Sequence, residues 1–289
     1  MAKLGDFMRI KHGFAFKGDY ITAEDNEIVL VTPGNFEIGG GFKEKKCKFF
    51  SGDYPKDYVL HADDLIVTMT DLSKQGDTLG YSARVPNSNR IYLHNQRIGL
   101  VDVFNPNADK DYLYWFMRTP QYQKKIVATA SGSTVKHTSP SRICDVEINL
   151  PSIDKQKKIA SLLTSIEKKI HISERINDNL EQQAAALFSS LYNRSNTEVR
   201  YTDLIQILGG GTPKTGETAY WNGNIAFFTP KDVGTPYTFI TEKTITEEGL
   251  SHCNSRLYPV NTVFVTARGT VGKVGLSGVP MAMNQSCYA

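Results

Sequence analysis

The chain has 289 residues, of which 40% are hydrophobic and 22% charged, and its formal net charge at pH 7 is +3. This composition is ordinary for a folded protein and excludes a collagen-like or grossly disordered chain, while the length predicts about two domains. The mild charge does not by itself require a nucleic-acid partner, and no stretch has the roughly 18 apolar residues of a membrane helix or the apolar run of a signal peptide.

The first 150 residues are rich in Gly, Tyr, Phe and β-branched residues, which predicts a β-rich domain. The predicted strands are residues 27–32, 64–70, 91–93, 98–104 and 146–150. Two short helices are predicted at residues 111–118 and 120–128. This part of the chain therefore combines strands with short helices that follow them.

The centre of the chain differs from both flanks, because residues 152–192 contain neither Gly nor Pro. Their apolar residues recur at three- and four-residue steps, which predicts one helix that begins after Ser152 as its N-cap. About 40 residues at 1.5 Å each make a rod of about 60 Å. Such a helix needs a partner helix from the same chain or from a second chain, unless it is an ordinary long core helix. The predicted interface residues are Ile159, Leu163, Ile166, Ile170, Ile176, Leu180 and Leu187.

The last 90 residues repeat the style of the first domain, with predicted strands at 224–228, 262–267 and 273–276. The sequence itself repeats as well. Thr32-Pro33 recurs as Thr229-Pro230, and Gly13 as Gly210, in both cases 197 residues later. Residues 64–68 match 262–266 at an offset near 198, and Asn95-Gln96 matches Asn284-Gln285 after a deletion in the second copy.

These observations predict an α+β protein with a period of about 197 residues. We expect a first β-rich domain at residues 1–150, a long spacer helix at 151–197, and the N-terminal part of a second β-rich domain at 198–289. The second copy lacks counterparts of roughly residues 97–150. We therefore expect it to be unable to close its core, because a partial sheet leaves unpaired edges and exposed apolar faces.

Catalytic and metal-binding signatures are not found in the sequence. Residues 209–215 superficially resemble a phosphate loop, but Pro213 stands where the glycine before Lys214 should be. There is no G-x-G-x-x-G, H-E-x-x-H or G-x-S-x-G motif, and the four cysteines lie far apart without a C-x-x-C pair. The sequence thus predicts no catalytic residue, no metal and no cofactor, and the cysteine pattern predicts a cytoplasmic protein.

Polar and basic loops give better candidates, for binding DNA. Asn and Gln can bond adenine, Arg can bond guanine, and hydroxyl and basic side chains suit phosphate. The candidate DNA-binding residues are Lys17, Thr70, Ser73, Lys74, Asn95, Gln96, Arg97, Ser133, Lys136, His137, Thr212, Lys214, Arg268 and Lys273. Each could instead be a solvated loop side chain. Asn95-Gln96 and Asn284-Gln285 could also stabilise turns, since identical residues in both copies cannot encode two different DNA sequences.

Several segments resemble the specificity subunits of type I restriction-modification systems. The most specific are residues 148–163 with the helix that follows, Gly210–Pro213, 220–223, 229–232 and 267–272. Residues 69–73 of the first copy depart from the Ala-Arg-Gly-Thr form of residues 267–270. The resemblance covers essentially the whole chain. It implies two target recognition domains held apart by paired antiparallel helices, each reading half of a bipartite double-stranded DNA site.

The resemblance also implies methylation and restriction subunits that supply catalysis in trans, so the chain itself is expected not to be an enzyme. A complete member of the family would carry two full domains and two helices. The sequence leaves several alternatives open: a half-subunit that forms a homodimer through the spacer helix, an inactive or recombining gene fragment, a free-standing DNA-binding protein, or a self-contained nuclease.

Overall fold

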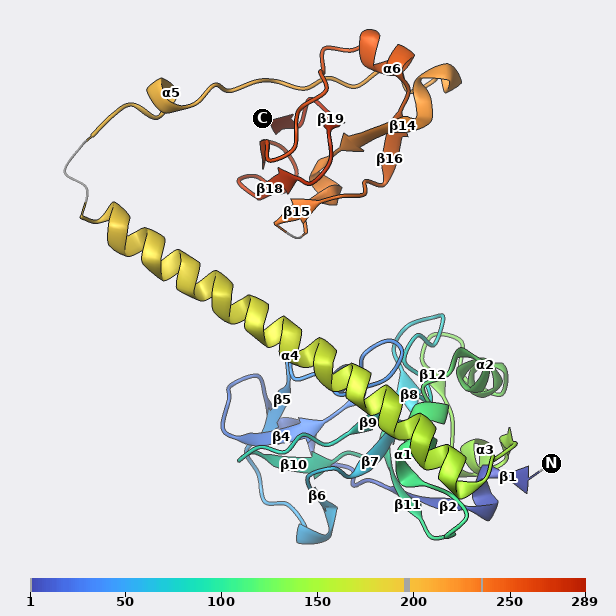
Figure 1. Cartoon of the computed structure of the whole chain (residues 1–289). Coiled ribbons are helices and arrows are strands. Elements are labelled where there is room, and N and C mark those ends of the chain that lie inside the picture. The colour runs from blue at the N-terminus through green and yellow to red at the C-terminus, as the bar shows by residue number, and fades with distance from the viewer. Residues whose placement is uncertain (1, 195–197, 235) are drawn as a thin grey trace. The chain divides into compact units, whose positions relative to one another are not determined.

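The computed structural model describes residues 2–194, 198–234 and 236–289. The chain divides into two compact units, Met1–Ala186 and Leu187–Ala289, which are described separately below (Figure 1). Both combine sheets with helices, so the predicted α+β class is confirmed. In the part of the chain that the structure describes, no helix is both long and apolar enough to cross a membrane.

Two sheets form the frame of the first unit. One has the order β3-β5-β4-β10-β6 and the other β2-β11-β7-β9, and two-stranded pairs β1-β13 and β12-β8 flank them. The strands are β1 (Ala2–Lys3), β2 (Met8–His12), β3 (Ile21–Thr22), β4 (Ile28–Val31), β5 (Lys48–Phe50), β6 (Val59–Leu60), β7 (Leu65–Thr68), β8 (Thr70–Asp71), β9 (Ser82–Arg84), β10 (Ile91–His94), β11 (Ile98–Val103), β12 (Lys136–His137) and β13 (Glu147–Ile148). Short 3-10 turns lie at η1 (Leu4–Asp6), η2 (Gly18–Tyr20), η3 (Pro33–Asn35) and η4 (Lys56–Tyr58).

Three short helices, α1 (Lys110–Phe116), α2 (Pro120–Ala128) and α3 (Pro140–Cys144), follow the strands. Each begins where a side chain accepts a hydrogen bond from the backbone N–H three residues on, and the capping residues are Asp109, Thr119 and Ser139. The helices pack on the sheet that contains β7. Leu65 and Val67 face them in one core cluster, whereas Ile66 joins a second cluster with the other sheet, as the two-residue period of a strand requires.

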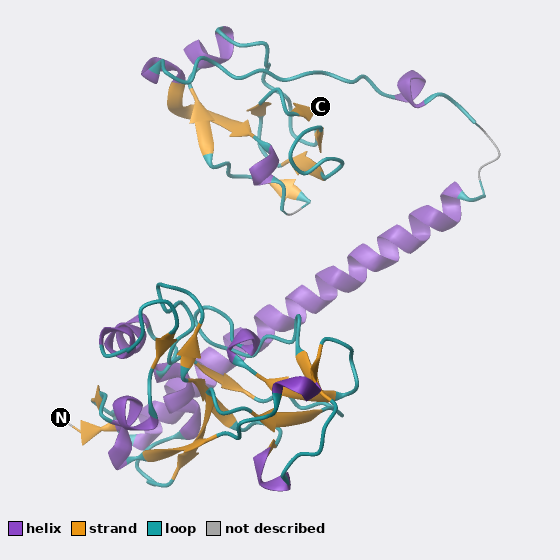
Figure 2. Cartoon of the chain, turned by 180° about the vertical axis from the view of Figure 1, so that it is seen from behind, coloured by secondary structure: helices purple, strands orange, loops and turns teal. Residues whose placement is uncertain are grey.

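The long helix α4 (Ile153–Tyr192) crosses the first unit and then extends beyond it (Figures 1 and 2). Gln156 and Ala160 are buried, and Glu167 is the last residue of the helix that is not fully exposed. Every residue from Lys168 to Tyr192 is exposed. The predicted helix is therefore confirmed, and about its first four turns dock on the domain.

The second unit contains the sheets β16-β14-β19 and β15-β18-β17-β20. Its elements are α5 (Tyr201–Leu204), η5 (Thr218–Tyr220), β14 (Trp221–Phe228), η6 (Pro230–Asp232), β15 (Tyr237–Thr238), β16 (Lys243–Ile245), α6 (Glu247–Ser251), β17 (Val263–Thr266), β18 (Val274–Ser277), β19 (Met281–Met283) and β20 (Cys287–Tyr288). Two clusters of buried side chains include the fully buried Phe228 and Phe264. The expectation that this unit cannot close a core is wrong in that these side chains pack on each other, but the exposed apolar face expected with it is present, since Val263 and Val274 of the sheet that contains β17 are 47% and 57% exposed.

The predicted repeat is present in the fold. In the first unit β4 pairs β10 in parallel, with Val31 opposite His94, and in the second unit β14 pairs β19 in parallel, with Phe228 opposite Met283. Added Cβ atoms at Gly13 and Gly210 would overlap the carbonyl oxygens of Asn95 and Asn284, respectively. The two glycines thus occupy the same place in the two units, where the backbone approaches too closely for any side chain.

The predicted strands and helices are all present, with ends that shift by a few residues. The largest shift is at residues 224–228, where the strand begins at Trp221, and at 146–150 only Glu147–Ile148 is a strand. Strands β2, β5, β9, β16 and β19, each three to five residues long, and the five-residue helices α3 and α6 were not predicted. Strands this short depend on their partners rather than on local sequence pattern.

Candidate nucleic-acid interface

The carboxyl ends of the parallel strands β4 and β10 begin the first candidate surface. Thr32 follows β4, and its backbone N–H donates to Asn35 Oδ1 (2.9 Å). Asn95 follows β10, is 9% exposed, and accepts the backbone N–H of Arg97 at Oδ1 (3.0 Å). This is the turn-stabilising role that the sequence analysis had left open for Asn95. Gln96 and Arg97 are exposed beside it.

Two segments that are 67 residues apart in the sequence, at Thr70 and His137, meet at this edge. Strand β8 pairs with β12, so that Thr70 lies opposite His137, and Thr70 Oγ1 lies 3.2 Å from His137 Nδ1. The backbone N–H of Met69 donates to the carbonyl of Arg97 (2.9 Å). The fold therefore brings Thr70, Arg97, Lys136 and His137 into one neighbourhood, in which Arg97 and His137 are exposed, Lys136 is half-buried and Thr70 is buried (3% exposed).

Asp71 organises the loop that follows β8. The backbone N–H of Ser73 donates to Asp71 Oδ1 (2.6 Å), and the Thr78 hydroxyl donates to Oδ2 (2.7 Å). Burial alone would raise the pKa of the Asp71 carboxyl, but the hydrogen bonds from Thr78 and Ser73 outweigh it and hold the pKa below its usual range. The ionised carboxylate of Asp71 therefore holds the loop that carries Ser73 and Lys74 through these hydrogen bonds.

The remaining candidate residues of the first unit differ in whether their side chains form hydrogen bonds within the protein. Ser73 Oγ accepts the backbone N–H groups of Gly76 and Asp77, so its hydroxyl oxygen holds the loop together. Lys74 and Ser133 are exposed on loops. Lys17 is exposed at the start of η2, in the segment whose Phe14 forms a bridge with Asn95. The structure therefore places the backbone of this segment beside Asn95 three residues before Lys17, and no hydrogen bond or ion pair of the Lys17 side chain is found among the described residues.

The second unit has an open hollow of about 370 Å³ at the corresponding strand ends. Its lining residues are Thr229, Pro230, Lys231, Glu242, Lys243, Arg268, Gly269, Asn284 and Ser286. Asn284 Oδ1 accepts the backbone N–H of Ser286 (3.0 Å), which repeats the turn at Asn95. Of the candidates from the sequence, Arg268 lies in this hollow.

The other candidates of the second unit lie around the hollow rather than in its lining. Thr212 Oγ1 donates to Gln285 Oε1, Lys214 is exposed, and the Lys273 backbone N–H donates to Thr266 Oγ1 (3.1 Å). The sequence analysis missed Lys231, Lys243 and Ser286. The offset of 197 between the copies could have found Lys231, because it follows the repeated Thr-Pro pair directly.

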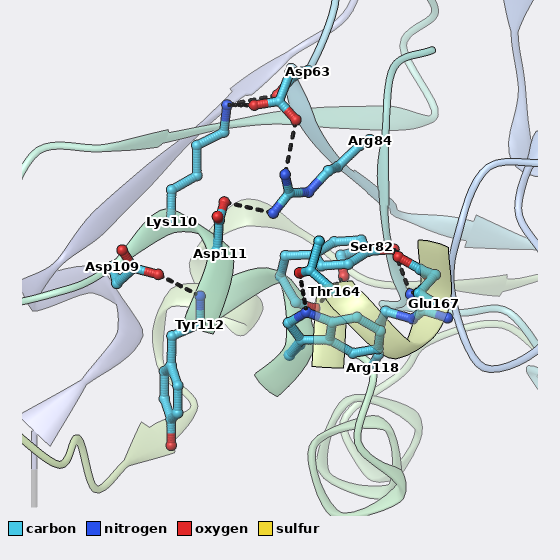
Figure 3. A network of polar contacts seen from close by, with 12 residues as sticks. Asp63, Ser82, Arg84, Asp109, Lys110, Asp111, Tyr112, Arg118, Thr164 and Glu167 are labelled. Carbon is cyan, nitrogen blue, oxygen red and sulfur yellow. Dashed lines mark hydrogen bonds and ion pairs between the residues drawn. The ribbon is translucent and has the colours of Figure 1, made fainter. Parts of the chain in front are cut away.

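The base of α4 is held on the first unit by a polar network (Figure 3). Arg118 Nη1 pairs with Glu167 Oε1, and the guanidinium of Arg118 lies 4.5 Å from the Trp115 ring centroid. Trp115 Nε1 donates to Thr164 Oγ1 (3.0 Å). Burial raises the pKa of Tyr114 to about 12, so its hydroxyl stays protonated and donates to Glu167 (3.2 Å).

Gln156 completes the attachment near the start of α4. Its side chain is fully buried, its Oε1 accepts the backbone N–H of Asp109 (2.9 Å), and its Nε2 donates to the carbonyls of Asn107 (2.8 Å) and Pro151 (2.9 Å). These bonds join the helix to the N-terminus of α1. Over the described residues, no group of three or more His, Cys, Asp or Glu side chains could hold a metal ion.

Comparison with known proteins identifies the family. The profile of the type I restriction modification DNA specificity domain matches residues 1–182 and 193–289, so the chain belongs to this family. The MjaIX specificity subunit of Methanocaldococcus jannaschii is 36% identical over 86 residues, which are 29% of this chain and 20% of that protein. The EcoBI specificity subunit of Escherichia coli is 30% identical over 157 residues, 54% of this chain and 30% of that protein.

A solved structure shares the fold. The S subunit of a type I restriction-modification system from M. genitalium matches 99% of this chain and 70% of its own, with a TM-score of 0.63 and 14% sequence identity. At that identity the likeness shows the fold alone. The matches to the two relatives above span less than a third of their lengths.

Proposed function

We propose that this chain acts as a DNA-recognition component of a type I restriction-modification complex, with each unit contacting one half of a bipartite double-stranded site. The observation that carries the proposal is the repeated polar platform: both units build the same turn at the ends of a parallel strand pair, at Asn95 and at Asn284. In the domain division 1–150, 151–197 and 198–289, the long helix is the spacer between two reading units.

The candidate DNA contacts are the polar and basic residues around these platforms. Arg97, Lys136 and His137 gather in the first unit, and Arg268 lines the hollow of the second. Methylation and restriction subunits in the cytoplasm would supply catalysis, and the net charge of +3 fits a subunit that shares the DNA backbone with such partners.

Selection from random double-stranded DNA tests recognition directly. The purified full chain should enrich a sequence, alone or with a methylation subunit, and the bound complex should weaken as salt rises because phosphate contacts release counterions. If the chain enriches no sequence, either alone or with a methylation subunit, the proposal is overturned. The chain alone with magnesium and plasmid DNA should give no cleavage, and co-purification with a methylation subunit would distinguish it from a free-standing DNA-binding protein.

We further propose that the exposed half of α4 pairs with α4 of a second copy. Ile166, Ile170, Ile176, Leu180 and Leu187 are 47–62% exposed, although they form an apolar stripe. At 100° per residue the centre of this stripe lies roughly 130° around the helix from the centre of Gln156, Ala160 and Glu167, the residues that dock on the first unit. One helix therefore carries two separate contact faces, of which the described residues cover only one.

Sedimentation of the full chain at several concentrations tests this pairing. The unmodified chain should dimerise, whereas Ile176→Glu combined with Leu180→Glu should be monomeric, because two charges would be buried in the seam. Gln182→Glu, on the other side of the helix from Leu180, is the control and should still dimerise. A monomeric unmodified chain at all concentrations would exclude the homodimer.

A further inference from the structure

The two units place identical residues at the same points of their platforms. Thr32 and Thr229 each donate a backbone N–H to the side chain three residues later, at 2.9 and 2.7 Å. Asn95 and Asn284 each accept the backbone N–H two residues later, at 3.0 Å. These shared residues hold the backbone in one shape, and because they are the same in both units they cannot make the units read different DNA sequences.

Three positions on the same platform carry different residues. Following the strand registers from Val31 and Phe228, Gly34 corresponds to Lys231. Strands β7 and β17 correspond, which makes Thr70 the counterpart of Arg268. Strands β11 and β20 also correspond, which makes Arg97 the counterpart of Ser286.

The second and third of these positions are neighbours in space in both units. The backbone N–H of Met69 donates to the carbonyl of Arg97 (2.9 Å), and the backbone N–H of Ala267 donates to the carbonyl of Ser286 (2.8 Å). In the second unit Lys231, Arg268 and Ser286 all line the hollow of about 370 Å³. The differing residues therefore surround one site, and the shared Thr229, Pro230 and Asn284 line it with them.

Each unit has one arginine at this site, but the two arginines are not at corresponding positions. Arg97 and Arg268 are both exposed, and no hydrogen bond, ion pair or aromatic contact of either guanidinium is found among the described residues. Other arginines of the first unit are engaged: Arg84 pairs with Asp63 and Asp111, and Arg118 pairs with Glu167. A guanidinium can donate two parallel hydrogen bonds to O6 and N7 of guanine in the major groove, which is the commonest specific side-chain contact to a base.

We propose that positions 34/231, 70/268 and 97/286 determine sequence specificity, and that Arg97 and Arg268 each contact a guanine in the half-site of their own unit. The inference rests on the proposed function, since it assigns the bases that a DNA-reading platform contacts. It predicts that the guanine lies at different positions of the two half-sites, because the arginine is at position 97 in the first unit and at position 268, the counterpart of position 70, in the second.

Selection from random DNA with variants of the full chain tests this assignment. Arg97→Ser gives the first unit the residue of the second, and Arg268→Thr does the reverse. Each should abolish the preference for guanine at one position of one half-site, lower affinity for the selected site about tenfold or more, and leave the other half-site unchanged.

Two further variants separate base reading from charge. Arg97→Lys keeps the charge but replaces the planar, preorganised fork of donors by a flexible point charge, so it should weaken the guanine preference less than Arg97→Ser does while keeping affinity for unrelated DNA. Lys45→Ser removes an exposed cation elsewhere on the first unit and should leave the selected sequence unchanged. All variants should melt at the temperature of the unmodified chain, because the replaced side chains are exposed.

The outcomes distinguish this inference from the proposed function. If the unmodified chain selects no sequence, the proposed function is overturned and the inference falls with it. If the unmodified chain selects a sequence and Arg97→Ser and Arg268→Thr select the same one, the proposed function stands and the assignment of the two arginines is wrong.

Discussion

In the first unit the sheet that contains β7 is covered by α1, α2 and α3, whereas the described residues of the second unit place no such helices on the sheet that contains β17. Met8 and Leu65 of the first unit are 1% exposed. Their counterparts by the repeat, Ile205 and Val263, are 39% and 47% exposed. The same few turn residues therefore build the same strand arrangement in both units. Helices bury one face of that arrangement only in the first unit.

The largest expected effect on stability comes from disrupting the close backbone approach that both units share, at Gly13 and at Gly210. Gly13→Ala and Gly210→Ala should each destabilise their own unit by about 3 kcal/mol or more, because the new Cβ would overlap the backbone carbonyl of Asn95 or Asn284. Denaturant unfolding followed by hydrogen exchange would assign the loss to one unit. Gly18→Ala and Gly209→Ala, where an added Cβ meets nothing within 4 Å, are the controls and should have little effect. Equal losses in all four variants would contradict the shared close approach.

The next prediction sharpens the difference in burial. Leu65→Ala should cost about 3 kcal/mol, because it opens a cavity in a core that helices cover on one side. Val263→Ala, at the same position of the second unit, should cost well under 1 kcal/mol, since the side chain is already half exposed. Chemical unfolding of the two variants measures both values. A similar cost at both positions would mean that the face of the second unit is covered in solution.

Much of this frame could be predicted from the sequence, because its signals are local. The helix α2 (Pro120–Ala128) was predicted with its observed ends, since Thr119 caps it and Pro120 begins it. The exact offset of Thr-Pro and of the glycines predicted the repeat. The long uninterrupted helical period predicted α4 to within a residue of its start.

The site was less predictable, because its residues meet through long-range pairing. Nothing near Thr70 indicates that β8 pairs with residues 136–137, and the two-residue strands have no period to detect. Gln156 looks like any polar helix residue, yet it is fully buried, because the loop before α1 supplies two backbone partners and the Pro151 carbonyl a third. Ser286 carries no signal of its own and stands out only when both copies are compared.

A third prediction concerns the attachment of α4, which belongs to the first unit. Glu167→Ala and Arg118→Ala should each cost about 2 kcal/mol, since the pair is only 24% and 16% exposed and each substitution strands its partner. The double variant should cost less than the sum, because the two side chains interact. Thermal melting measures the cycle. Lys3→Ala removes an exposed ion pair with Asp145 and should leave the melting temperature unchanged. Additive losses at 118 and 167 would show that the pair does not hold the helix.

The smallest expected effect uses a position at which the two frames differ chemically, His94 against Met283. Burial lowers the pKa of His94, and the contact of Nε2 with the Ile98 carbonyl (2.8 Å) only partly offsets it. The folded protein therefore holds His94 neutral with Nε2 as donor, whereas the unfolded chain takes up a proton below its ordinary pKa of about 6.5. The stability that this group contributes is complete above that pH and falls as the pH drops through it.

His94→Met, which copies the second unit, removes this dependence and also the bond to Ile98. The unmodified chain should be the more stable at pH 7.5, and its advantage over the variant should shrink as the pH falls toward 5. Comparing the two proteins at each pH cancels the groups they share. His61→Gln, at a side chain that is 85% exposed, is the control and should keep a constant gap. An advantage that grows toward pH 5 would mean that His94 is charged in the fold, with its buried proton stabilised by a partner.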